Sequence, residues 1–133
     1  KMKFKNIYLL SLLSLALLSS CIENELAFDV IESPVLAIFD EMEAEEGMLK
    51  IQATFYELDK SGILDQNIGI DSTAISGMTV GVYVEESVLI QEYTTDASGI
   101  IVFDKPLEAL GGNTRLEWVG NYKDTPFRIY KKF

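Results

Sequence analysis

Few side chains in this 133-residue chain could carry out chemistry. The sequence contains no histidine, which removes the most common general base, the most common metal ligand and every nucleophile that histidine would activate. Cys21 is the one cysteine, so a zinc site would depend almost entirely on oxygen ligands, which is rare. We therefore expect no catalysis, no metal and no cofactor. Cys21 is the residue that we expect to be chemically modified.

One group of oxygen ligands still offers a possible calcium site between residues 59 and 67. The group consists of Asp59, Ser61, Asp65 and Asn67. It does not follow the EF-hand pattern, because its glycine is misplaced and no glutamate closes the loop. The preferred interpretation is a polar turn without metal.

Two pairs of carboxylates have the chemistry needed to hydrolyse a glycosidic bond. They are Glu57 with Asp59 and Glu85 with Glu86. Both pairs fall at predicted strand ends or turns, and no cleft is predicted beside them. We expect all four side chains to be solvated turn residues.

Aromatic residues supply the candidates for binding. Trp118 shares a strand face with Leu116 and Gly120, and this face is predicted to pack in the core. Four tyrosines are expected on outward faces: Tyr56, Tyr83, Tyr122 and Tyr130. A row of tyrosines on a sheet could bind a sugar ring or a partner protein, and we select Tyr83, Tyr122 and Tyr130 as candidates. The alternative is that they reflect only the preference of strands for aromatic residues.

The first 20 residues have the pattern of a secretory signal peptide. Three lysines precede an apolar stretch at 7–18, and small residues follow it. The stretch is shorter than the roughly 20 apolar residues of a membrane-spanning helix. The sequence Leu18-Ser19-Ser20-Cys21 resembles the lipobox of bacterial lipoproteins. The resemblance implies that residues 1–20 are removed and that Cys21 is lipidated; the alternative is an ordinary signal peptide with an incidental cysteine.

Residues 21–33 are predicted to be the lipidated cysteine and an acidic tether. Residues 22–46 contain nine acidic side chains and no basic one, and the whole chain has a net charge of −10. This balance argues against a nucleic-acid partner, whose phosphates require a basic surface. Acidic residues at Glu23 and Glu25 resemble the surface-export signal of Bacteroidota lipoproteins; the alternative is a linker that is merely solvated.

The remaining residues, 34–133, alternate in the manner of β-strands. The clearest segments are 49–56 and 78–84, where apolar and polar residues alternate with a period of two. Further strands are predicted at 34–39, 88–94, 100–103, 115–122 and 126–132. About seven short strands with frequent turns predict an all-β fold, an antiparallel immunoglobulin-like β-sandwich. The two longest predicted loops, 57–77 and 105–114, are further candidates for binding.

The segment 77–103 carries a second resemblance. The hairpin Thr95-Asp96-Ala97-Ser98-Gly99 with Phe103 resembles a turn found in immunoglobulin-like and transthyretin-like modules of bacterial surface proteins. The physical basis is that Asp96 can cap its own turn and Gly99 can adopt a positive φ. The resemblance implies a scaffold and no particular chemistry.

These observations predict a lipoprotein anchored in the bacterial outer membrane that presents a non-catalytic β-sandwich at the cell surface. Its partners are expected to be the membrane, through the lipid anchor, and an unidentified protein or glycan. The first alternative is a periplasm-facing structural subunit of an envelope or secretion complex. The second is an enzyme or an enzyme inhibitor.

Overall fold

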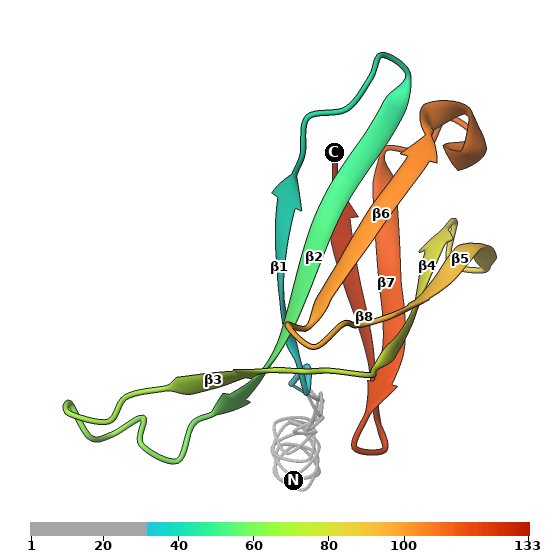
Figure 1. Cartoon of the computed structure of the whole chain (residues 1–133). Helices are drawn as coiled ribbons and strands as arrows, with labels where there is room; N and C mark the ends of the chain where they lie inside the picture. Colours follow the sequence, from blue (N-terminus) through green and yellow to red (C-terminus); the bar gives the residue numbers. More distant parts are fainter. Residues whose placement is uncertain (1–31) are drawn as a thin grey trace, which may run out of the picture. The chain divides into compact units, whose positions relative to one another are not determined.

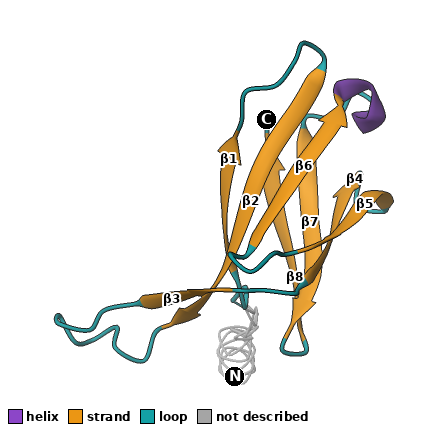
Figure 2. Cartoon of the chain, viewed as in Figure 1, coloured by secondary structure: helices purple, strands orange, loops and turns teal. Residues whose placement is uncertain are grey.

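A computed structural model describes residues 32–133 of the chain. The predicted leader 1–20, Cys21 and nearly all of the predicted tether 21–33 therefore lie outside the described residues. The described part is almost entirely β-structure, and two sheets face each other (Figures 1 and 2). Its elements are β1 (Leu36–Glu41), β2 (Met48–Asp59), β3 (Asp71–Ala74), β4 (Thr79–Val84), β5 (Val88–Thr94), β6 (Ile100–Pro106), the 3-10 helix η1 (Leu107–Leu110), β7 (Arg115–Tyr122) and β8 (Thr125–Lys132).

Every strand pairing is antiparallel. In the first sheet β2 pairs with β1 along one edge, and along the other edge it pairs first with β6 and then with β3. The second sheet has the order β5-β4-β7-β8. This arrangement is an immunoglobulin-like β-sandwich, as the sequence predicted, with eight strands where about seven were expected.

The core lies between the two sheets and is built around Trp118 on β7. The Trp118 ring is fully buried, and its centroid lies 5.3 Å from Phe39, 6.3 Å from Phe55 and 6.1 Å from Phe103. Leu116 points into the same layer, and Gly120 leaves the space that the ring of Phe127 fills. The predicted inward face of this strand is therefore confirmed.

The turn predicted at 96–99 is present. The carboxylate of Asp96 accepts hydrogen bonds from the backbone N–H groups of Ser98, at 2.8 Å, and Ile100, at 2.9 Å. Gly99 has a φ of 75°, a conformation that favours glycine. The sequence pattern identified this turn because the hydrogen bonds to the Asp96 carboxylate that cap it are local.

Some boundaries differ from the predicted ones. The first strand begins at Leu36, beyond Pro34, and continues to Glu41. The second strand extends to Asp59. The segment 57–77, which was expected to contain loops and one or two short strands, continues with a loop at 60–70, the short strand β3 and a connection to β4. The strand β6 continues to Pro106, and the 3-10 helix η1 occupies part of the predicted loop 105–114.

Candidate functional site

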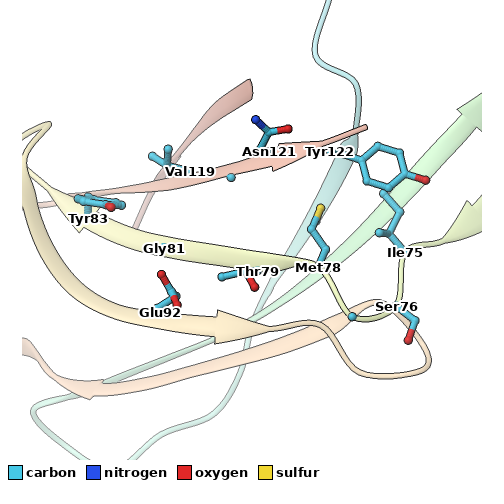
Figure 3. A pocket seen from close by; sticks show the side chains of 12 residues that line it. Ile75, Ser76, Met78, Thr79, Gly81, Tyr83, Glu92, Val119, Asn121 and Tyr122 are labelled. Carbon is cyan, nitrogen blue, oxygen red and sulfur yellow. The ribbon is translucent and has the colours of Figure 1, made fainter. Parts of the chain in front are cut away.

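The outer face of the sheet β5-β4-β7-β8 carries a depression of about 580 Å³ (Figure 3). We call it the Gly81 depression after the residue at its floor. It is lined by Ile75, Ser76, Gly77, Met78, Thr79, Gly81, Tyr83, Glu92, Val119, Gly120, Asn121 and Tyr122. This volume lies within the range of small-molecule sites in proteins.

The sheet is hollow here because Gly81 has no side chain. Gly81 lies opposite Glu92 of β5 on one side and Val119 of β7 on the other. The ring of Tyr83 folds over the glycine: a Cβ atom at Gly81 would lie 2.6 Å from the Tyr83 ring. Gly81 therefore sets both the depth of the depression and the position of Tyr83 at its end.

Polar groups surround this floor. Glu92 and Asn121 point from β5 and β7 at opposite sides of the depression, and Thr79 lies on β4 between them (Figure 3). No hydrogen bond within residues 32–133 uses the side chain of Glu92 or Asn121. A carboxylate, an amide and a hydroxyl group are thus available to a ligand beside an aromatic ring.

A buried ion cluster adjoins Tyr83 on the same face. The side chain of Glu117 is fully buried, although it points away from the core, and it pairs with Arg115 at 2.9 Å and with Arg128. The Arg115 guanidinium lies 4.6 Å from the centroid of the Tyr130 ring, and that of Arg128 lies 6.0 Å from the centroid of the Tyr83 ring. The cluster fixes both tyrosines, because a planar guanidinium packs well on an aromatic face.

Tyr122 lines one end of the depression but does not face outward, against our expectation. It is the last residue of β7 and packs at the edge of the core, and its hydroxyl donates a 2.7 Å hydrogen bond to Glu57 Oε2 on β2 of the opposite sheet. Glu57 also accepts a hydrogen bond from Lys123. Hydrogen bonds from Lys123 and Tyr122 hold the pKa of Glu57 below its usual value, and the bond to Glu57 raises the pKa of Tyr122. This cluster closes one end of the sandwich by joining the two sheets.

The remaining candidates from the sequence are placed as follows. Tyr83 and Tyr130 lie on the outer face on either side of Glu117, but only Tyr83 lines the Gly81 depression. Cys21 lies outside the described residues.

The four oxygen-bearing residues considered for calcium form local turns. The carboxylate of Asp59 accepts the N–H of Ser61, and that of Asp65 accepts the N–H of Asn67, both at 2.9 Å. In the described part of the chain no three acidic, histidine or cysteine side chains gather in a way that could hold a metal. These carboxylates therefore act as caps of their own turns.

The two carboxylate pairs considered for glycoside hydrolysis are not directed into the depression. Glu57 is bound to Tyr122 and Lys123, and Asp59 caps its own turn. Glu85 and Glu86 form the turn between β4 and β5, where both have positive φ values of 51° and 59°. The acidic residue at the depression is instead Glu92.

Sequence reasoning missed Gly81, Glu92, Asn121 and the Glu117 cluster. A glycine within a strand often marks a close approach of another group, and this signal was present at Gly81. Glu117, between the core residues Leu116 and Trp118, was also visible as a charged residue that must face outward. Neither signal says which residues lie on the neighbouring strands.

No family model, no curated protein and no solved structure matches this chain. No helix within residues 32–133 has the length and apolar character needed to cross a membrane.

Proposed function

We propose that this chain is a lipid-anchored binding module of the bacterial outer membrane that presents a non-catalytic β-sandwich at the cell surface. In this proposal Cys21 carries the lipid, residues 22–33 are the tether, and the sandwich binds the partner. The lipobox pattern at 18–21 and the acidic residues after it support the anchor and the outward display. No activity is assigned, because the acidic residue at the depression has no second carboxylate opposite it.

The observation that carries the binding role is the Gly81 depression, which combines a floor without a side chain, an aromatic ring and uncommitted polar side chains. We propose a carbohydrate as its ligand. Hydroxyl groups of a sugar would bond Glu92, Asn121 and Thr79, and a ring would pack beside Tyr83. A depression of about 580 Å³ accommodates a ligand of one or two sugar rings.

Three variants of the full chain test the site on an array of bacterial polysaccharides. Gly81→Ala places a methyl group on the floor, and Glu92→Gln removes one charge without changing shape. Gly81→Ala should weaken binding because its methyl group displaces the Tyr83 ring. Glu92→Gln should weaken it about tenfold or more, since a hydrogen bond to a charged group contributes about 1.5–3 kcal/mol. Glu108→Gln on η1 is the matched control and should bind like the parent. A parent that binds no polysaccharide, or depression variants that bind like it, would refute the site.

The anchor and the orientation require separate measurements. Cys21→Ser should abolish incorporation of a labelled fatty acid and release the chain from the membrane fraction or leave it unprocessed. Protease treatment of intact cells should cut the sandwich only if it faces outward. Full protection on intact cells, with cleavage after the outer membrane is opened, would instead indicate a periplasm-facing subunit.

A further inference from the structure

The loop between β2 and β3 exposes an unusual amount of apolar surface. Residues 60–70 include four of the twelve large apolar side chains that are exposed in the described part of the chain. These are Ile63, 56% exposed, Leu64, 97%, Ile68, 68%, and Ile70, 51%. Single exposed apolar residues are ordinary, but four within eight positions form a patch that indicates an interaction site.

This loop has a defined backbone conformation. Hydrogen bonds join Ile63 N–H to the Lys60 carbonyl at 3.0 Å and Asp65 N–H to the Gly62 carbonyl at 2.9 Å. Ile68 covers Gly62 so closely that a Cβ atom there would lie 2.2 Å from the Ile68 side chain. The backbone of the loop is therefore fixed while its apolar side chains stay exposed, which reduces the entropic cost of binding.

The position of the loop indicates what covers it. The end of β2 and the strand β3 project from the body of the sandwich, whereas η1 lies at the opposite end (Figure 1). The described chain begins at Glu32, and Glu32 forms an ion pair with Lys60, the first residue of the loop. Only ten residues, 22–31, lie between Cys21 and Glu32, and the eleven Cα–Cα steps from Cys21 to Glu32 span about 36–40 Å at most. A lipid on Cys21 therefore keeps the loop within reach of the bilayer surface.

We propose that loop 60–70 is a membrane contact, whose apolar side chains enter the surface of the lipid bilayer. The inference rests on the proposed lipid anchor, which supplies the proximity. Asp59, Asp65 and Asp71 lie in or beside the loop, so an anionic surface repels it and a zwitterionic surface accepts it. The contact orients the sandwich, because it adds a second point of attachment to the lipid anchor.

The test uses the lipidated full chain in phosphatidylcholine vesicles. Because the sulfur of Cys21 is acylated, Leu64→Cys introduces a single free thiol for a polarity-sensitive fluorophore, and Glu108→Cys on η1 provides the matched control. We expect a blue shift at position 64 and quenching by a lipid-borne quencher, with neither effect at position 108. Phosphatidylglycerol in the vesicles should weaken the quenching at position 64, and added salt should restore it.

The outcomes separate this inference from the anchor itself. Vesicles that carry the lipidated chain but show no quenching at position 64 would overturn the membrane contact and leave the anchor intact. Equal quenching at positions 64 and 108 would also overturn it, because the whole domain would then lie on the lipid. A blue shift that depends on protein concentration and not on lipid would assign the loop to contact between copies. A chain without lipid on Cys21, as seen by mass spectrometry, refutes the anchor and the membrane contact together.

Discussion

Replacing Gly99 with alanine should destabilise the sandwich more than the same change at any freely exposed turn glycine. Gly99 joins the turn after β5 to β6, and its carbonyl accepts the N–H of Phe55 at 2.9 Å. Its φ of 75° costs a non-glycine residue about 1–2 kcal/mol. A Cβ atom would in addition lie 2.6 Å from the Phe55 carbonyl oxygen and 3.1 Å from the Ile75 nitrogen. These two backbone atoms are hydrogen-bonded to each other at 3.0 Å, so they cannot move aside without loss of that bond.

The sum of the two effects is a loss of about 3 kcal/mol in the free energy of unfolding, since forced contacts in a packed site cost about 1–3 kcal/mol. Gly77 provides the matched control. Its φ is 72°, almost the same, but a Cβ atom there would meet nothing within 4 Å. Gly77→Ala should therefore cost only the backbone term of about 1 kcal/mol.

Urea unfolding followed by fluorescence of Trp118 measures both variants, because this ring is the one tryptophan and is fully buried. In thermal melts the loss of about 3 kcal/mol corresponds to a decrease of roughly 12–24 °C for a domain of this size, against roughly 4–8 °C for the control. Equal losses for Gly99→Ala and Gly77→Ala would refute the reasoning, because the contact with Phe55 would then contribute nothing.

Three further predictions follow from the side-chain clusters. Arg128→Ala should lower the free energy of unfolding by about 2–3 kcal/mol, because it leaves the buried Glu117 carboxylate with one partner. Glu117→Gln should lower it less, because the two arginines are partly exposed and can bind water. The reverse order of the two variants in urea unfolding would contradict this account. The lowered pKa of Glu57 stabilises the fold above the usual value of 4.5, and this contribution disappears as the pH falls through the lowered pKa. The parent should therefore lose stability more steeply on acidification than Glu57→Gln, and parallel pH profiles of unfolding would argue against it. Because Asp59 and Asp65 cap their own turns, the melting temperature should be the same with and without a chelator, and a clear decrease on chelation would restore the calcium interpretation.

The amino-acid sequence by itself determined the β class of the domain, most strand positions and the turn at 96–99. The period-two pattern at 49–56 and 78–84 indicates strands because successive side chains of a strand point to opposite faces. The same argument placed Trp118 in the core. The turn was predictable because Asp96 and Gly99 act on atoms only a few residues away.

The tertiary structure decided everything that depends on neighbouring strands. Alternation predicts that Glu117 points outward beside Arg115 of its own strand, but only the pairing of β7 with β4 and β8 adds Tyr83, Tyr130 and Arg128 and so buries it. Alternation already places Tyr122 on the face of Trp118 and Gly120, so the expectation of an outward Tyr122 was wrong on the sequence pattern itself. Only the structure shows that its hydroxyl meets Glu57, 65 positions earlier in the chain. The Gly81 depression likewise requires β5 and β7 on either side of one glycine. These residues are brought together by strand register across the sheet, and a single sequence specifies register only through the whole packed core.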